Sequence, residues 1–315
     1  MELKSQHLTL SSLLVAGLLS GCSADNGAEN DITSNDVIRM TVKNDWQALT
    51  RTAFIYEDDS QLTPFKVFAY KHGTDDKFID GSRVVKNGEI WEPDHRYYWP
   101  VLDALDFFAY MPYDLTNCVV DAGNVDYVPA SGPTFSCTMP SSSEGQDDKS
   151  EFIYAYVTDK KRDTDAAGVK LDFHHPFAAV RFVLNENNDN VTINSIVIKN
   201  AMTGGTFSHG ATPQWSGLSG AADLTLTVNK LFEKKSEVQA ITGPYLVIPQ
   251  TFAGNKQTIV VNFSDNGISD VLEAEITDPS WTASNIYTYK LTIDTSLKVT
   301  VTTIDINPWT KFEWN

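Results

Sequence analysis

The sequence predicts an all-β protein, and three observations support that prediction. Short segments of alternating or β-branched apolar residues recur about every 10–15 residues, the spacing typical of a β-sandwich. Gly, Pro, Asn or Asp residues separate these segments, as turns between strands require. Neither a sustained helical periodicity nor a strand–helix–strand rhythm is present, which argues against a parallel α/β sheet.

Each expected strand has its own apolar pattern. The first is apolar at nearly every position, the next two are rich in aromatic residues, and most of the later ones alternate. In chain order, the expected strands are Val37–Val42, Phe65–Tyr70, Asp106–Tyr110, Phe152–Val157, Val169–Phe173, Ala179–Leu184, Thr192–Lys199, Asp223–Val228, Tyr245–Ile248, Gln257–Phe263, Val271–Ile276, Ile286–Ile293 and Lys298–Ile306.

Charge and length narrow the class of protein. The 315 residues include 24 Lys and Arg against 41 Asp and Glu, a formal net charge of −17. Nucleic-acid binding needs a basic face, so we expect no nucleic-acid partner, and an anionic membrane surface would repel the protein charge. The apolar share of 42% fits a folded chain, and the length suggests about two domains of roughly 150 residues.

The first 21 residues read as a lipoprotein signal peptide. The apolar run Leu8–Leu19 is too short for a transmembrane helix, which needs about 20 residues, and suits a signal-peptide core. It leads into Leu19-Ser20-Gly21-Cys22, which resembles the lipobox of bacterial lipoproteins. We therefore expect lipidation (diacylglycerol and palmitate) at Cys22 and export to the outer membrane. The alternative is an ordinary signal peptide with an incidental cysteine.

Composition divides the rest of the chain. Residues 22–35 are polar, acidic and aperiodic, and read as a tether. The polar stretch Asp159–Gly168 is the best linker candidate, because β-branched alternation becomes cleaner and aromatic content falls beyond it. The sequence thus predicts an N-terminal β-sandwich domain over residues 36–168 and a C-terminal one over residues 169–315.

Two cysteines remain once Cys22 carries lipid. Cys118 and Cys137 form an even pair in an exported chain, which favours a disulfide. A bridge closing a loop of about 20 residues would stabilise the fold by about 3 kcal/mol in the chain-entropy model. The alternative of two buried free thiols stays open, because spacing does not show how close the Cα atoms lie.

Motifs for catalysis, cofactors or metals are weak or missing in the sequence. No phosphate-binding glycine loop is present, and Gly217-Leu218-Ser219-Gly220 falls short of a serine-nucleophile elbow and reads as a loop. His174 and His175 are adjacent, so in a strand they point to opposite faces, one inward and hydrogen-bonded and the other outward. Paired acids such as Asp75-Asp76 read as solvated loop charge rather than a glycosidase pair. We expect no enzyme, cofactor or metal.

Aromatic residues gather between Trp91 and Tyr113. They read either as the core of the first sandwich, built on Trp99, Phe107 and Tyr110, or as an exposed platform for stacking on sugar rings. We favour the core.

The order of several motifs resembles the fimbrillin family of Bacteroidota, the type V pilus subunits, and in particular the group similar to minor-fimbria (Mfa-like) proteins. The resemblance runs over nearly the whole chain and implies two tandem transthyretin-like β-sandwich domains. The motifs that carry it are Tyr98-Trp99-Pro100, Leu105–Tyr110, Phe173–Val180 (which begins Phe173-His174-His175-Pro176-Phe177), Tyr245–Gln250 and Ile306-Asn307-Pro308-Trp309.

The resemblance also implies a mechanism of assembly. Subunits of this family reach the outer membrane as lipoproteins, and an Arg-specific protease then removes the lipid together with the first strand. A C-terminal strand of another subunit fills the vacated groove by donor-strand exchange. In this sequence Arg51 occupies the matching place, after the expected strand Val37–Val42. The alternative is that Arg51 is an ordinary surface arginine and the protein stays lipidated, as anchor subunits do.

The C-terminal segment is the other part of that mechanism. Leu297, Val299 and Val301 share one face of the expected strand, whereas Ile304 and Ile306 share the other, which predicts a bulge or two successive strands. The segment reads either as a donor strand for another subunit or as a last strand packed within its own chain.

We therefore expect a cell-surface fimbria subunit that serves adhesion, has no catalytic activity, and has other pilus subunits and an Arg-specific protease as partners. Adhesion would engage a host or bacterial surface glycan or protein. The alternatives are a lipid-anchored outer-membrane glycan-binding protein that stays unprocessed and, less favoured, a surface glycosidase.

Overall fold

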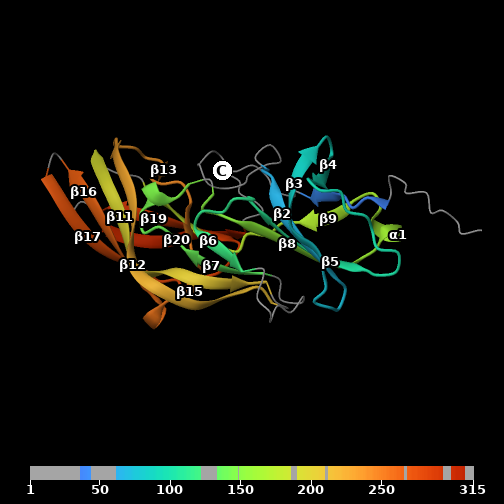
Figure 1. The fold of residues 1–315 in the computed structure, drawn as a ribbon. Helices are drawn as coiled ribbons and strands as arrows, with labels where there is room; N and C mark the ends of the chain where they lie inside the picture. Colours follow the sequence, from blue (N-terminus) through green and yellow to red (C-terminus); the bar gives the residue numbers. More distant parts are fainter. Residues whose placement is uncertain are drawn as a thin grey trace, which may run out of the picture. The chain divides into compact units, whose positions relative to one another are not determined.

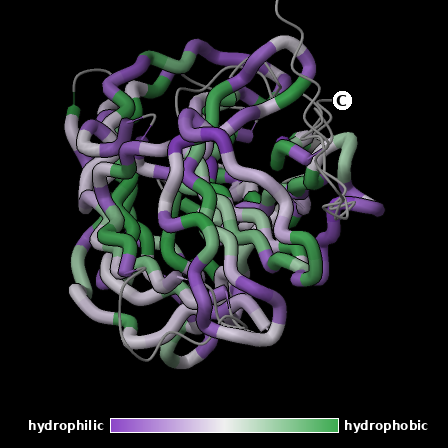
Figure 2. Tube along the Cα trace, turned by 45° about the vertical axis from the view of Figure 1, so that its right-hand side comes forward, coloured by the Kyte–Doolittle hydropathy of each residue, from purple (hydrophilic) through white to green (hydrophobic). Residues whose placement is uncertain are grey.

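The computed structural model describes most of the chain beyond the expected tether, and β-strands are its main secondary structure (Figure 1). The all-β prediction is confirmed. Figure 2 shows hydrophobic segments gathered in the strands of the interior and hydrophilic ones in the turns between them. The described residues are 36–43, 62–121, 133–147, 149–185, 190–209, 212–265, 268–293 and 299–308.

The first sheet joins seven strands of the described chain and nearly closes on itself. Its order is β8-β5-β2-β3-β4-β1-β9. The two outer strands are linked by a β-bridge in which Tyr154 and His174 exchange backbone hydrogen bonds of 3.1 and 2.8 Å. The strands are β1 (Met40–Lys43), β2 (Phe65–Lys71), β3 (Lys77–Asn87), β4 (Ile90–Pro93), β5 (Leu105–Met111), β8 (Ile153–Lys160) and β9 (Val169–Asp172).

A second sheet has the order β13-β10-β19-β20, with β14 also paired to β10. Strands β10 and β19 run parallel, while β20 runs antiparallel to β19 at the edge of the sheet. The strands are β10 (Ala178–Leu184), β13 (Gln239–Ala240), β14 (Tyr245–Val247), β19 (Asn285–Ile293) and β20 (Val299–Pro308).

A third sheet has the order β17-β16-β11-β7-β6, with β12 also on β11. Strands β11 and β12 form a long hairpin, and the C-terminal part of β11, Gly204–Ser208, also pairs with β7. This sheet therefore combines strands from both halves of the sequence. The strands are β6 (Cys118–Asp121), β7 (Thr134–Thr138), β11 (Val191–Ser208), β12 (Gln214–Phe232), β16 (Gln257–Asp265) and β17 (Ile268–Ile276); β15 (Gln250–Thr251) and β18 (Ser280–Trp281) form a small pair, and α1 (Arg162–Asp165) is a single helical turn.

Three clusters of buried side chains fill the described chain. The N-terminal cluster lies within the first sheet and includes Met40, Phe65 and Trp91. The C-terminal cluster lies between the second and third sheets and includes Trp281 and Tyr289. A shared cluster combines aromatic residues of both halves: Phe108, Tyr110, Phe135, Phe152 and Tyr154 pack with Phe177, Phe207 and Ile286.

The predicted division at residue 168 stays a prediction. Strand β9 follows it in sequence and pairs with β1 of the first sheet, whereas β6 and β7 precede it and pair within the third sheet.

One local prediction is wrong. The segment Gly217–Gly220 reads as a loop from its composition, but it lies inside β12, where Ser219 pairs with Gly204 of β11. The glycines are there for backbone geometry: Gly220 has a φ of +68°, and a Cβ at that position would lie 2.8 Å from Thr203 Oγ1. Only glycine combines this left-handed backbone with so close a neighbour.

Cys118 and Cys137 face each other across β6 and β7 and form a disulfide. The bond joins the ends of a loop with a sequence separation of 19 residues. Replacing both cysteines with alanine is expected to lower the free energy of unfolding by about 3 kcal/mol, because the unfolded chain regains loop entropy. Denaturant unfolding of the variant and of the wild-type protein with and without reductant measures this loss. Equal midpoints under all three conditions would contradict it.

Candidate functional site

Strand β1 lies inside the first sheet rather than at its edge. It runs parallel to β9, with Met40 to Lys43 opposite Val169 to Asp172, and antiparallel to β4, with Met40 opposite Trp91. We call the position between β4 and β9 the β1 seat. Because both neighbours bond to β1, its removal would leave two unpaired strand edges facing each other.

The β1 segment, residues 36–43, packs alternate side chains into the N-terminal cluster. Ile38 and Met40 are fully buried, and Val42 packs against the same cluster from a half-buried position. The cluster beneath them is aromatic: the ring of Phe65 lies 5.3 Å from that of Trp91 and 5.5 Å from that of Phe173. The seat is therefore an apolar groove that accepts side chains at every second position of an extended segment.

Backbone hydrogen bonds hold the β1 segment on both sides. Ile38 N–H donates to Tyr97 O at 2.9 Å and Trp99 N–H donates to Asp36 O at 2.8 Å. On the opposite side, Val169 N–H donates to Arg39 O at 2.7 Å. These bonds involve no side chain of the segment, so another extended strand could make them as well.

Two ion pairs add to the attachment. Arg39 Nε lies 2.9 Å from Glu92 Oε1, and Arg162 lies 3.0 Å from Asp36 Oδ1. Hydrogen bonds from Asn87 and from Arg39 hold the pKa of Glu92 below its usual range. Both pairs are partly exposed, so they position the strand more than they stabilise it.

The C-terminal strand β20 pairs with a strand of its own chain. It bonds only to β19 within the described residues, and a register shift at Thr288 and Tyr289 leaves one extra residue, Ile304, in β20. The predicted bulge is thus confirmed. Val299 and Val301 pack on the C-terminal cluster, whereas Ile306 is 46% exposed. Whether this strand is also donated to another subunit stays a prediction.

The motif Phe173–Phe177 connects the first sheet to the second. His174 is exposed, whereas His175 is buried with its Nδ1 2.5 Å from Glu151 Oε1, which confirms the expected inward and outward pair. Burial raises the pKa of Glu151, and the neighbouring His175 opposes that shift. Nearby backbone groups are also bonded: Ser284 Oγ donates to His175 O at 2.6 Å and Trp215 Nε1 to Pro176 O at 2.6 Å. The motif is a fixed junction rather than a flexible link.

A second buried histidine predicts a loss of stability in acid. His209 packs against the rings of Phe108, Tyr154 and Tyr156, and burial, with a smaller contribution from His174, lowers its pKa to about 4. Between pH 6.5 and 4 the unfolded chain protonates this group and the folded chain does not, so stability falls as pH falls. Allowing for solvent screening, we expect a loss of about 2 kcal/mol over this window.

His209→Phe keeps an aromatic ring in that position and removes the titrating group. Denaturant unfolding at pH 7 and at pH 4 should show a smaller loss for this variant than for the wild-type protein. Identical losses would mean that the histidine does not set the acid sensitivity.

The aromatic residues between Trp91 and Tyr113 are mostly core, as expected. Trp91, Trp99, Phe107, Phe108 and Tyr110 are all buried. Of this group, Tyr98 and Tyr113 are the exposed members, at 40% and 38%. The glycan-binding alternative rested on an exposed platform that included Trp91, and the buried indoles remove that support.

Three residues singled out from the sequence fall outside the described part. Cys22 and Arg51 lie outside the described residues, as does Trp309. Within the described ranges, no group of three or more His, Cys, Asp or Glu side chains could hold a metal ion. No helix among the described residues is long and apolar enough to span a bilayer. The β1 seat could not be found from the sequence, because it joins strands that lie far apart in the chain.

Comparisons with known proteins agree with this architecture. The family model described as fimbrillin-like matches residues 50–309. Among solved structures, a candidate cell adhesion protein from Bacteroides uniformis has a TM-score of 0.56 at 17% identity, covering 89% of this chain and 100% of its own. Another from Bacteroides ovatus has a TM-score of 0.55 at 14% identity, covering 88% and 99%. No curated protein matches. The match to the family model over most of the chain shows that the protein belongs to the fimbrillin-like family.

Proposed function

We propose that the protein is a structural subunit of a cell-surface fimbria, without catalytic activity, that serves adhesion. Membership of the fimbrillin-like family supports a place in a fimbria and association with other pilus subunits. We further propose that it is exported as a lipoprotein through Cys22 and assembles by donor-strand exchange after cleavage at Arg51. The lipobox-like segment and the position of Arg51 after β1 support these steps.

The observation that carries the proposal is the β1 seat. Cleavage after Arg51 would release the segment that contains β1. In that segment Ile38 and Met40 pack into the N-terminal cluster, and β1 pairs with β4 and β9. Its loss would expose two strand edges and an aromatic groove, both of which attract an extended strand. Because the seat bonds mainly to backbone, a strand from another subunit satisfies it provided that its alternate residues are apolar.

Strand β20 supplies a candidate for that donor. It lies at the edge of its sheet, so its release breaks one ladder only, the one with β19. Val299 and Val301 present apolar side chains at alternate positions, the pattern that the β1 seat accepts. The bulge at Ile304 brings Ile306, which pairs with Tyr287, to the face of Val299 and Val301, which pair with Ile293 and Leu291. The extra residue interrupts the strict alternation, so β20 matches the groove without a break only up to the bulge.

The test uses the purified full chain and an Arg-specific protease. We expect a single cut with a new N-terminus at Thr52, followed by oligomers that resist mild denaturation. The control Arg51→Lys keeps the charge but removes the cleavage site, and it should stay monomeric. Arg39 lies in a hydrogen-bonded segment, so we do not expect the protease to cut there. Arg39→Lys should therefore be cut at Arg51 as the wild-type protein is. Cleavage without oligomers, or oligomers from the uncut Arg51→Lys chain, would contradict the proposal.

A further inference from the structure

Two adjacent apolar side chains stand out from the loop that leads from β4 to β5. Val101 is 81% exposed and Leu102 is 92% exposed, more than any other large hydrophobic residue of the described chain. The loop itself is fixed on both sides: Trp99 is buried beside it, and Ala104 O accepts the backbone N–H of His72 at 2.8 Å. The loop therefore presents two adjoining apolar side chains on a rigid base, a candidate contact for a partner.

This tip lies at the end of the first sheet where the described chain begins. Trp99, two residues before Val101, bonds to the backbone of Asp36, the first described residue. The side chain of Asp36 is held by Arg162 of α1, in the connection between β8 and β9. The first described residue, Asp36, therefore lies beside the loop that carries Val101 and Leu102.

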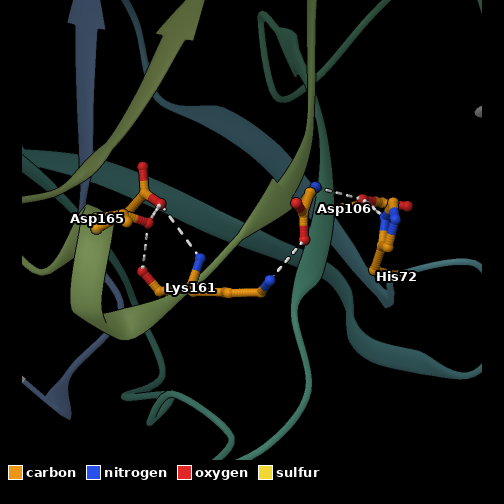
Figure 3. A network of polar contacts seen from close by, with 6 residues as sticks. His72, Asp106, Lys161 and Asp165 are labelled. Carbon is orange, nitrogen blue, oxygen red and sulfur yellow. Dashed lines mark hydrogen bonds and ion pairs between the residues drawn. The ribbon is translucent and has the colours of Figure 1, made fainter.

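The charges around the tip are largely paired with one another. Lys71 lies 3.4 Å from Asp103, and Lys161 lies 3.2 Å from Asp159. Figure 3 shows the neighbouring network, in which His72 Nδ1 lies 2.8 Å from Asp106 Oδ1 while Asp165 accepts the backbone N–H of Lys161. A zwitterionic surface carries no net charge, so the net charge of −17 on the whole chain does not oppose an approach from this end.

We propose that the side chains of Val101 and Leu102 insert into the headgroup region of a lipid bilayer when the chain is anchored through Cys22. This inference rests on the lipid anchor of the proposed function. We take the 13 residues from 23 to 35 as the tether that their composition predicts. A polar tether of that length would have a root-mean-square span of about 20 Å and would keep the tip at an effective concentration in the millimolar range beside the membrane. A contact too weak to hold the free protein is then sufficient to orient the tethered one.

The experiment places an environment-sensitive fluorophore on Leu102→Cys in the full, lipid-modified chain, reconstituted in phosphatidylcholine vesicles. Leu102 is almost fully exposed, so the substitution leaves the fold intact. The matched control is Ile268→Cys on β17, 74% exposed and in a different sheet. We expect the probe at 102 to shift its emission to shorter wavelength and to be quenched by brominated lipids, and the probe at 268 to do neither. In the unlipidated Cys22→Ser chain both probes should stay in water.

Each other outcome contradicts the inference in a recognisable way. If the chain floats with the vesicles but the probe at 102 is not quenched, the tip does not touch lipid, and the proposed lipid anchor still stands. If the emission shifts with protein concentration in the absence of vesicles, a second copy of the chain covers the tip instead. If the full chain does not float with vesicles at all, both the anchor and the inference fail.

Discussion

His175→Ala is expected to lower the free energy of unfolding by about 3–5 kcal/mol, because it leaves Glu151 buried without its partner. Glu151 is fully buried and bonds to His175 at 2.5 Å, and its other oxygen, Oε2, has no hydrogen-bond partner among the described residues. In the variant the carboxyl would be pushed further toward its protonated form. Denaturant unfolding at pH 7 measures the loss.

The loss should depend on pH with a definite sign. Burial already raises the pKa of Glu151 from its ordinary value of 4.5, so the folded variant holds a proton that the unfolded chain releases above that pH. The stability of His175→Ala therefore falls as pH rises above 4.5, and its deficit relative to the wild type is smallest in acid.

A double variant separates the pair from its packing. Glu151→Met combined with His175→Leu replaces both polar groups with apolar ones of similar size, so no charge is left unpaired. It should regain most of the stability that the single variant loses. A double variant as unstable as His175→Ala would mean that shape at the junction, rather than the unpaired carboxyl, determines the loss.

Met40→Asp is expected to release the β1 segment, at a cost of at least about 3 kcal/mol, since it removes a buried side chain and places a carboxylate in an aromatic groove. Met40 is fully buried in the N-terminal cluster. The backbone N–H of Val169, which donates to Arg39 O, reports directly on this attachment. Its hydrogen exchange should become about a hundredfold faster or more, since every 1.4 kcal/mol is a factor of ten.

Thr41→Asp is the control for that experiment. Thr41 follows Met40 in the same strand and is only half buried, so its side chain points to the opposite face of the sheet. The exchange of the Val169 amide should change little in this variant. Equal acceleration in both variants would show that the backbone of β1, and not the apolar side chain, holds the strand in place.

The sequence pattern predicts strands well where apolar residues are frequent, as in β2, β5, β10 and β19, each within about two residues of its expected bounds. It misses β3 and β4, because the segment Lys77–Pro93 has many polar positions and two turn-forming glycines. It also underestimates the β11–β12 hairpin, whose far part is rich in Gly, Ser and Ala and is held as strand by pairing with β7. Local pattern fails where tertiary pairing determines the structure.

The candidate site shows the same limit. Ile38 and Met40 can be read as core from the apolar first segment, but their neighbours cannot, since Val169 lies far along the chain and pairs in parallel with β1. The sequence likewise does not predict that Glu151 is the partner of His175, because Glu151 follows a polar stretch that reads as solvated. The family resemblance provided the mechanism that local patterns could not.

Hydrogen exchange along β4 and β9, before and after cleavage at Arg51, tests the central claim most directly, namely that the β1 seat is refilled by a strand from another subunit. We expect the amides of both strands to be protected in the full chain, to lose that protection when cleavage removes β1, and to regain it in the oligomers. Oligomers in which β9 still exchanges freely, or a cleaved monomer in which β4 and β9 stay protected, would contradict it.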